Sequence, residues 1–370
     1  MTGSSGGAGD LHSALFLAPE VARARGGIQR LGRDLVEALR CAEPGRTPGV
    51  LVLNDSQGEI HDGWPTSGAR GFAGNRGRFV GAALRAVSRH RVIILGHRNF
   101  LPLAVALKLR RSRAETWLLL YGVEAHPTLT WLERGAMCAI DRVIAISPQT
   151  AAAFRASGCH RAVELWPCGL PSTWSMPEAR PPRFESPCRW LSVARLVRSD
   201  GYKGVDHTIE ALAFLPRGSA VLDIVGDGDD LPRLRQWAQD RGVSDHVRFH
   251  GGVSDGRLRE LYGACDVFVL PSRGEGFGIV YLEAMAYAKP VVAADAGGAP
   301  FVVRPGVSGA LVPYAAPEHI ASCVTEWMRD PGSARRLGQS ARRLVEQTFS
   351  FRAFVTRAED LLGTRHREPL

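Results

Sequence analysis

The sequence predicts an α/β protein built from two domains, each a parallel sheet with helices on both faces. Short aliphatic and β-branched runs alternate with amphipathic helical patterns along the whole chain. These runs are continuously apolar, which is typical of parallel strands buried on both faces. The chain has 370 residues, more than one core of ordinary size requires. A stretch at 166–188 with six prolines and no periodicity marks a linker between the domains.

The individual elements follow from the same patterns. In the first half we expect strands at 14–18, 50–54, 91–95, 116–121, 142–146 and 162–166, with helices between them such as 27–40. In the second half we expect strands at 189–194, 220–225, 247–250, 266–270 and 290–294, followed by helices at 317–329, 332–347 and 350–362. The predicted domain plan is a disordered tail at 1–10, domains at 11–166 and 189–349, a linker at 167–188, and a last segment at 350–370.

Composition narrows the class of protein. Hydrophobic residues make up 45% and charged residues 22%, as in ordinary globular proteins. No run approaches the roughly 18–20 apolar residues that span a bilayer, and the first ten residues lack the features of a signal peptide. The seven cysteines are scattered without a Cys-x-x-Cys pair. We therefore expect reduced thiols and a cytoplasmic protein.

The positive charge is concentrated in the first half. Residues 1–170 hold 21 Lys and Arg against 13 Asp and Glu, whereas residues 171–370 hold 25 against 24. The basic stretches at 76–91 and 108–113 are either an ordinary solvated surface or a surface that attracts an anionic membrane or nucleic acid. Motifs of nucleic-acid-binding domains are missing from the sequence, so we expect no nucleic-acid partner.

Three glycine-containing turns follow predicted strands in the second half, at 225–230, 250–255 and 271–278. Helix N-termini after such turns present free N–H groups to anions. Gly226 alone is a weak signal, because it lacks the rest of a dinucleotide-binding pattern. Asp227 and Asp229 favour a helix start over a metal site, and Ser254 or Asp255 can cap the next helix.

The turn at 271–278 carries two acids eight positions apart, Glu275 and Glu283. Glycine at 276 and 278 lets backbone N–H groups approach an oxygen-rich ligand. Glu283 falls just over one turn into the following helix, with its side chain tilted toward the helix start. Carboxylates accept hydrogen bonds from vicinal hydroxyls, so both acids could bind one sugar or nucleotide. The competing interpretation is a helix-start acid and an unrelated surface acid.

Two cations could offset these acids. Arg195 and Lys203 flank an Asp-Gly turn after the strand at 189–194. The turn could fold both side chains over one anionic group, with Lys as a compact charge and Arg as a bidentate donor. Each could instead be a surface cation. A diphosphate held in this way requires no metal, so we expect neither a metal site nor a cofactor.

Residues 189–313 resemble the retaining nucleotide-sugar glycosyltransferases of the GT4 group, which have the GT-B fold of two facing Rossmann-like domains. The resemblance rests on the segments "VARLVRSDGYKG", "LDIVGDGDD" and "PSRGEGFGIVYLEAMAYAKPVV", which occur in the family's order. It implies that Arg195 and Lys203 hold the donor diphosphate and that Glu275 contacts the donor sugar. It also implies ribose binding by Glu283 and backbone contacts from the positions Gly226, Val253, Gly276, Phe277 and Gly278.

The first half resembles the family more loosely. Gly26 and Gly27 match the family's first glycine loop, close to the diphosphate. The loops at 95–102 and 121–129 resemble acceptor-side loops, with the candidates His97, Tyr121, Glu124 and His126. Many relatives carry a histidine at the position of Tyr121. The last helix of this fold often returns to the first domain, and 350–362 is the candidate.

The resemblance thus implies a retaining, metal-independent hexosyltransferase that uses GDP-mannose or a UDP-hexose. The expected acceptor is a glycan, lipid-linked at the inner face of an anionic membrane, in polysaccharide or glycolipid synthesis. Two other classes stay open. One is another enzyme of the same architecture, a sugar-nucleotide epimerase or a phosphorylase with a cofactor lysine. The other is a basic nucleic-acid-binding protein.

Overall fold

The structure is a computed structural model that describes residues 12–22, 27–61, 68–111, 113–174 and 176–364. The predicted tail at 1–10 and the predicted ligand contact Gly26 lie outside these residues. Contacts divide the chain into two compact units. The first unit comprises residues up to Ile146, Thr150–Trp166 and the chain from Phe354 onward; the second comprises Ser147–Gln149 and Pro167–Ala353.

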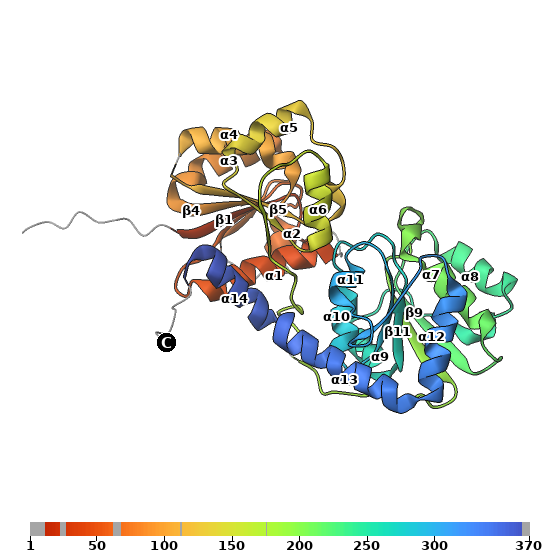
Figure 1. Cartoon of the computed structure of the whole chain (residues 1–370). Coiled ribbons are helices and arrows are strands. Elements are labelled where there is room, and N and C mark those ends of the chain that lie inside the picture. Colours follow the sequence, from red (N-terminus) through yellow and green to blue (C-terminus); the bar gives the residue numbers. More distant parts are fainter. Residues whose placement is uncertain (1–11, 23–26, 62–67, 112, 175, 365–370) are drawn as a thin grey trace, which may run out of the picture. The chain divides into compact units, whose positions relative to one another are not determined.

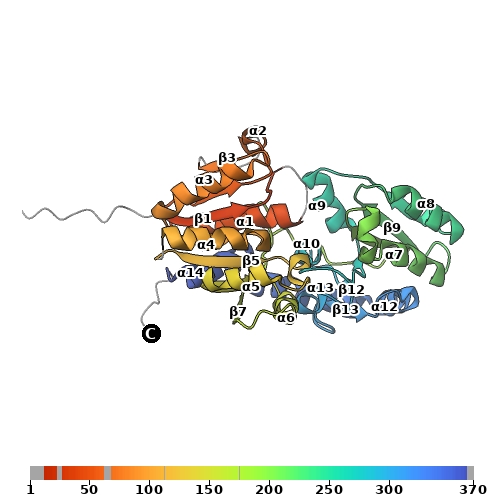
Figure 2. The same cartoon turned by 90° about the horizontal axis from the view of Figure 1, so that it is seen from above.

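The first unit is built on a seven-stranded, fully parallel sheet in the order β3-β2-β1-β4-β5-β6-β7. Figure 2 shows the sheet from β3 at one edge to β7 at the other. Its strands are β1 (His12–Ala18), β2 (Gly49–Val52), β3 (Ala69–Gly71), β4 (His90–Leu95), β5 (Glu115–Leu120), β6 (Arg142–Ala145) and β7 (Val163–Leu165).

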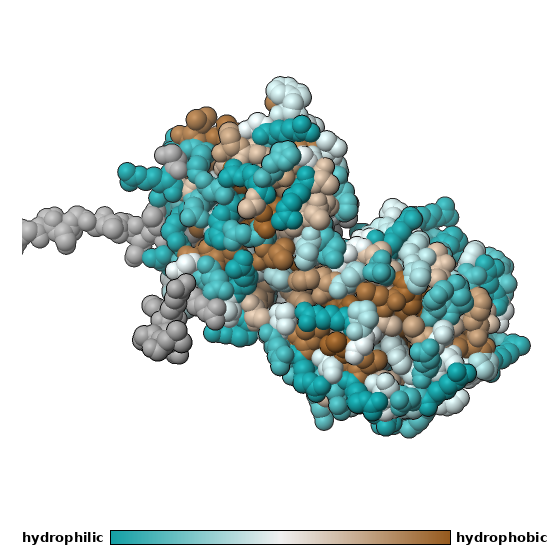
Figure 3. Space-filling view, in the orientation of Figure 1, coloured by the Kyte–Doolittle hydropathy of each residue, from teal (hydrophilic) through white to brown (hydrophobic). Residues whose placement is uncertain are grey.

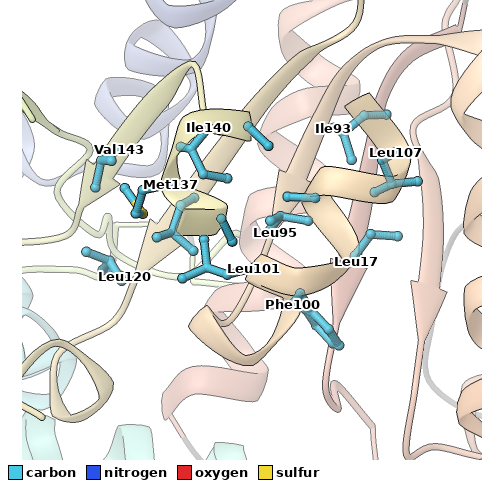
Figure 4. Close-up of a cluster of buried hydrophobic side chains, with 14 of the residues drawn as sticks. Leu17, Ile93, Leu95, Phe100, Leu101, Leu107, Leu120, Met137, Ile140 and Val143 are labelled. Atoms are coloured by element: carbon cyan, nitrogen blue, oxygen red, sulfur yellow. The ribbon is translucent and has the colours of Figure 1, made fainter. Parts of the chain in front are cut away.

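Helices cover both faces of this sheet (Figure 1). They are α1 (Gly27–Ala42), α2 (Gln57–His61), α3 (Arg76–Ala86), α4 (Leu101–Arg110), α5 (Trp131–Ala136), α6 (Pro148–Ala156) and α14 (Phe351–Leu362). Short 3₁₀ helices lie at Val87–Arg89, Arg98–Phe100, Val123–Ala125 and Met137–Ala139. Helix α1 illustrates the amphipathic pattern that predicted these helices. Its leucines recur every four residues on one face, and all three are buried: Leu31, Leu35 and Leu39. On the α3–α4 side, strand and helix side chains form one apolar core, drawn in Figure 4.

The second unit contains a six-stranded parallel sheet in the order β10-β9-β8-β11-β12-β13. The strands are β8 (Cys188–Val193), β9 (Ala220–Val225), β10 (Val247–Phe249), β11 (Val267–Leu270), β12 (Val291–Ala294) and β13 (Gly309–Val312). The helices are α7 (Val205–Ala211), α8 (Leu231–Asp240), α9 (Asp255–Ala264), α10 (Ile279–Ala286), α11 (Ala299–Val302), α12 (Pro317–Arg329) and α13 (Pro331–Thr348). Short 3₁₀ helices lie at Arg198–Lys203, Leu212–Phe214 and Ser244–His246. The first six strands of each sheet, taken in chain order, have the arrangement 3-2-1-4-5-6 of the Rossmann fold.

Every strand and helix expected from the sequence is present, with bounds that differ by a few residues at most. Two strands, β3 and β13, were not predicted. Strand β3 has three residues and includes the exposed Arg70. Strand β13 begins at Gly309, where an added Cβ would lie 1.9 Å from the Val291 carbonyl oxygen. Both are short edge strands, and such strands lack the continuous apolar run that identifies a central parallel strand.

The proline-rich linker contains no helix or strand among its described residues between Leu165 and Cys188. It is held instead by scattered hydrogen bonds. Leu170 N–H donates to the Phe349 carbonyl at 2.6 Å, and Arg342 Nη1 donates to the Pro177 carbonyl at 2.6 Å. The linker therefore follows the surface of the second unit in an extended form.

Helix α14 belongs by its contacts to the first unit from Phe354 onward. Trp166 Nε1 donates to the Phe354 carbonyl at 3.1 Å, and the two rings lie 5.0 Å apart between centroids. Arg142 Nη1 donates to the Leu361 carbonyl at 2.6 Å, and Arg357 Nε donates to the Leu165 carbonyl at 2.8 Å. The last described helix thus packs on the first unit.

On the face shown in Figure 3, hydrophilic residues cover most of the surface and hydrophobic ones are scattered among them. Of the large hydrophobic side chains for which the structure gives an exposure, Leu109 and Trp131 are the most exposed, at 83% and 80%. Within the described residues, no helix combines the length and the apolar character needed to cross a membrane.

Candidate functional site

The strand order of the second unit reverses between β8 and β11, which are neighbours in the sheet. In doubly wound folds, ligands bind beyond the carboxyl ends of the strands at such a reversal. The chain leaving β8 carries Arg195 and Lys203, and the chain leaving β11 carries Glu275. Parallel strands end at the same edge of the sheet, so the fold brings these predicted site residues to one place.

Lys203 and Glu275 form an ion pair between these two loops. Their side chains are 19% and 12% exposed, respectively. Burial alone would lower the pKa of Lys203, but the attraction and hydrogen bond of Glu275 outweigh burial and raise this pKa above its ordinary value. The ammonium is therefore charged at neutral pH and fixed in position next to the carboxylate.

Arg195 pairs with an acid that the sequence analysis did not single out. Its Nε and Nη2 donate to one carboxylate oxygen of Asp200 at 3.0 and 2.7 Å. The arginine side chain is 63% exposed, whereas that of Asp200 is 6% exposed. Asp200 lies in the 3₁₀ helix Arg198–Lys203, the Asp-Gly turn expected to fold the two cations together. Each cation of the site is thus oriented by its own carboxylate.

Close backbone packing holds the two loops together. A Cβ on Gly204, whose φ is 71°, would lie 2.7 Å from the Pro271 carbonyl oxygen. Gly274 lies against the Tyr202 ring, and Arg273 N–H donates to the Tyr202 carbonyl at 3.0 Å. Tyr202 is therefore a support for both loops, next to Lys203 in the chain.

The glycine turn at 271–278 is supported from a third loop. Gly298 N–H donates to the Glu275 carbonyl at 2.7 Å, and a Cβ on Gly298 would lie 2.3 Å from the Gly276 carbonyl oxygen. The Phe277 side chain is buried and contacts the rings of Phe301 and Phe349 edge-on. Its side chain thus anchors the turn in the core, which leaves the backbone as the part that a ligand could contact.

Helix α10 begins directly after this turn, with Gly278 as its N-cap residue at φ 93°. Glu283, its fifth residue, is 2% exposed. Its Oε2 accepts a hydrogen bond from the Tyr262 hydroxyl at 2.8 Å. Tyr262 is fully buried on α9 and was missed by the sequence analysis, because nothing local links it to an acid 21 positions later. The competing interpretation of Glu283 as a surface acid is therefore wrong.

The remaining second-unit candidates lie in neighbouring turns. Gly226 has φ 141°, and an added Cβ would lie 1.8 Å from the Ala194 carbonyl oxygen. Glycine at this position therefore allows the turn after β9 to contact the chain that leaves β8. Val253 is half-buried in the turn after β10. Ser254 caps α9 as expected, accepting from Arg257 N–H at 3.3 Å. Whether Gly226 and Val253 contact a ligand stays a prediction.

The expectation that Asp227 and Asp229 serve the helix start is wrong. Asp227 accepts a hydrogen bond from Gly252 N–H at 2.6 Å, and Asp229 accepts one from Arg198 N–H at 2.9 Å. Both acids therefore tie turns together across the carboxyl edge of the sheet. In the described part of the chain, no three His, Cys, Asp or Glu side chains gather as a metal-binding group.

The first-unit candidates other than Gly27, which begins α1, follow β4 and β5. His97 Nδ1 accepts from Asn99 N–H at 3.1 Å and caps a short helix; burial lowers the pKa of this histidine, which favours the neutral ring. The Glu124 carboxylate accepts from the backbone N–H of the buried Tyr121. His126 and Gly27 are exposed. The loop after β5 is thus stabilised by a contact between two of the predicted residues.

Arg98 organises these first-unit loops and was not among the predicted residues. It is 6% exposed and donates to both Glu133 carboxylate oxygens at 2.8 and 2.7 Å. It also donates to the carbonyls of Glu124 and Pro127 at 3.0 and 2.6 Å. The hydrogen bonds that Glu133 accepts from Arg98, together with those from Thr130, lower the pKa of this carboxyl group to about 2. A buried arginine therefore joins the loop after β4 to the loop after β5.

Comparison with known proteins assigns the second unit. The sequence model described as "Glycosyl transferases group 1" matches residues 179–344. The second unit is a group 1 glycosyltransferase domain. The predicted family is confirmed, and the matched range contains the cations, both acids and the glycine turn. The GT-B fold is also confirmed by a solved structure, that of HepE of Anabaena in complex with UDP. The two structures superimpose with a TM-score of 0.80 and are 21% identical in sequence. The superposition covers 95% of this chain and all of the HepE chain.

Curated relatives resemble the same domain. A GDP-mannose-dependent alpha-(1-6)-phosphatidylinositol monomannoside mannosyltransferase of Mycobacterium tuberculosis is 36% identical over 169 residues, 43% of this chain and 44% of the relative. A D-inositol 3-phosphate glycosyltransferase of Streptomyces bingchenggensis is 42% identical over 115 residues, 31% of this chain and 25% of the relative. The chain thus matches less than half the length of these relatives, within the glycosyltransferase domain.

Proposed function

We propose that the protein is a retaining glycosyltransferase that transfers a hexose from a nucleoside-diphosphate donor to a glycan acceptor. The observation that carries the proposal is the pairing of Lys203 with Glu275 at the sheet's reversal point, with Arg195 on the same loop as Lys203. A cation and an acid at the same point suit a donor with a charged diphosphate and a hydroxyl-rich sugar.

In the proposed mechanism, Arg195 and Lys203 stabilise the negative charge that grows on the leaving diphosphate oxygen. Groups fixed before the reaction stabilise a transition state without reorganisation, and Glu275 fixes Lys203 in this way. The Glu275 carboxylate would accept hydrogen bonds from sugar hydroxyls, and Glu283 from the ribose. The departing diphosphate oxygen would take the acceptor proton, and the cations would supply the charge stabilisation without a metal.

The donor type is proposed from the relatives. One relative is named as GDP-mannose-dependent, and HepE was solved with UDP; GDP-mannose and UDP-hexoses are therefore the donors to test. The acceptor is proposed to be lipid-linked, because the relative's acceptor is a phosphatidylinositol mannoside by name and the first half of the chain is basic. Anionic membranes attract such basic surfaces.

The first test is a thermal-shift panel of nucleotides and nucleotide-sugars, because a bound ligand raises the melting temperature by mass action. The donor that gives the largest shift is then used in transfer assays, with the anomeric configuration of the product read by NMR. We expect Lys203→Ala to lower kcat by about 10²–10³-fold. Unchanged kcat at saturating donor would refute the leaving-group role.

A matched control is Lys108→Ala, which removes a lysine that pairs with Asp141 in the first unit at 2.6 Å. It should leave kcat unchanged. Formation of an epimerised nucleotide-sugar without transfer would favour the epimerase alternative. Binding of the chain to duplex DNA or RNA that persists at high salt concentration would favour the nucleic-acid alternative.

A further inference from the structure

The second unit has a basic hollow at the edge of its sheet opposite the candidate donor site. Arg189, Asp266 and Lys289 lie at or just before the amino ends of β8, β11 and β12, three neighbouring strands. Strand β8 has six residues, so at about 3.3 Å per residue its two ends lie about 20 Å apart. The hollow and the Lys203–Glu275 pair are therefore separate places on one domain.

The hollow has a volume of about 770 Å³, within the range of small-molecule sites. Its basic lining residues are Arg180, Arg183, Arg189 and Lys289, and its acidic ones are Glu178, Glu185 and Asp266. The three arginines and both glutamates are exposed, whereas Lys289 is 1% exposed. A buried ammonium thus lines a hollow whose exposed charged groups are three guanidinium groups and two carboxylates.

The Asp266 carboxylate accepts hydrogen bonds from backbone N–H groups of the linker and of β8. Its Oδ1 accepts from the N–H groups of Arg183 and Phe184 at 2.8 and 3.1 Å, and its Oδ2 accepts from Arg189 N–H at 2.9 Å. Three N–H groups are therefore satisfied by this carboxylate, which orients the chain that carries two of the arginines. Among the described residues, no carboxylate forms an ion pair with the four basic side chains of the hollow.

Two of the four basic side chains, those of Lys289 and Arg180, meet at Gly263 at the end of α9. Lys289 Nζ donates to the Gly263 carbonyl at 3.0 Å. A Cβ on Gly263 would lie 3.1 Å from Arg180 Nη1, so this guanidinium covers the same residue. Burial lowers the pKa of Lys289. The neighbouring Cys265 and Asp266 oppose this shift, and the positive charges of Arg180 and Arg183 add a smaller lowering. An anion between these groups would relieve their repulsion.

The wall of the hollow is held in place by the backbone. Arg180 N–H donates to the Tyr287 carbonyl at 3.3 Å. Arg335 on α13 donates to the Pro182 carbonyl at 3.1 Å through Nε. The linker residues that carry Arg180 and Arg183 are thus fixed on the domain, so their side chains extend from a defined surface.

We propose that this hollow is a second anion site, which binds a phosphate-bearing group through Lys289, Arg180 and Arg183. A phosphate group offers several oxygens to lysine and arginine donors at once, and the volume leaves room for the rest of a larger ligand. The group could come from a soluble phosphate compound or from a lipid headgroup, since both present the same oxygens.

The test is calorimetric titration of the full chain with inorganic pyrophosphate. It is done in an Arg195→Ala/Lys203→Ala background so that the proposed donor site does not contribute. We expect binding to persist in this background and to weaken about tenfold for each of Arg180→Ala and Arg183→Ala, the loss typical of a charged hydrogen bond. Arg217→Ala/Arg329→Ala is the matched control, with two exposed arginines removed elsewhere in the same unit.

A substitution of the buried lysine separates a binding role from a structural one. Lys289→Met keeps a similar volume and removes a buried charge, whose burial costs more free energy than its hydrogen bond to the Gly263 carbonyl returns. We expect an equal or higher melting temperature together with loss of pyrophosphate binding. No pyrophosphate binding in the background, or binding that survives Arg180→Ala/Arg183→Ala unchanged, would overturn the proposal.

Flotation with phosphatidylcholine vesicles, with and without phosphatidic acid, distinguishes the two sources of the group. Binding to phosphatidic acid that depends on Arg180 and Arg183 would identify a lipid headgroup. Pyrophosphate binding without vesicle binding would identify a soluble compound. Failure of the donor-site proposal would appear separately, as nucleotide binding that Arg195→Ala/Lys203→Ala leaves intact.

Discussion

The hydrogen bond from Tyr262 to Glu283 gives the sharpest test of the proposed nucleotide contact. Tyr262→Phe removes one hydroxyl and keeps the ring, which packs against Trp174, Phe268 and Tyr287. The hydroxyl donates at 2.8 Å to a carboxylate in a residue that is only 2% exposed. A hydrogen bond to a buried charged group contributes about 1.5–3 kcal/mol.

If Glu283 binds the ribose, loss of this donor leaves the carboxylate poorly oriented. The nucleotide affinity should then fall between about tenfold and 150-fold, the equivalent of that energy. The assay is calorimetric titration with the nucleotide that gives the largest thermal shift. Tyr281→Phe is the matched control, since Tyr281 is equally buried but donates to the Leu270 carbonyl at 2.9 Å.

The control variant should lose some stability and keep its nucleotide affinity. An affinity of Tyr262→Phe within twofold of the unmodified protein would refute the role of Tyr262 in positioning Glu283. A double-mutant cycle with Glu283→Gln adds a second criterion, because residues in direct contact show non-additive effects. Additive losses would mean that the two side chains act independently on the ligand.

Two further predictions concern the loops. Gly298→Ala should lower donor affinity or kcat at least tenfold, because the added Cβ would lie 2.3 Å from the Gly276 carbonyl oxygen. Gly256→Ala, on the exposed face of α9, is the control. It should leave the free energy of unfolding unchanged or raise it by up to about 1 kcal/mol. Equal activity of both variants would contradict the first. Glu133→Gln should remove about 1–2 kcal/mol at pH 7, after allowance for solvent screening. Because hydrogen bonds from Arg98 and Thr130 lower the pKa of Glu133 to about 2, this contribution is present above pH 4.5 and disappears toward pH 2. Urea unfolding at pH 7 and pH 2.5 checks whether the difference between the two proteins shrinks in acid.

The central strands could be predicted because each lies between two neighbours and is covered on both faces. Strand β11, for example, is buried at all four positions and has an unbroken apolar sequence. The edge strand β13 contains a glycine that its close approach to β12 requires, and a glycine weakens a sequence-based strand prediction. Prediction of the fold therefore depended on burial, and it failed at two of the four edge strands, β3 and β13.

The site could be predicted in part for a geometric reason. Turns that follow parallel strands meet at one edge, so Lys203 and Glu275 come together although 72 positions separate them. The residues that orient the site lie outside that rule. Asp200 has the ordinary appearance of a turn residue, and Tyr262 reaches Glu283 from the middle of a neighbouring helix. Their roles depend on side-chain directions, which only the packed structure fixes.

The two cation–carboxylate pairs have different strengths, and this difference shapes how a diphosphate would bind. Arg195 is 63% exposed, so its pair with Asp200 is screened by water and contributes at most about 1 kcal/mol. Lys203 is enclosed with Glu275, and separation of that pair would leave two poorly solvated charges. An incoming diphosphate would therefore recruit Arg195 away from Asp200 at low cost while Lys203 stays in place. Under the proposed function, Lys203 would therefore define where the leaving group binds, and Arg195 would adapt to it.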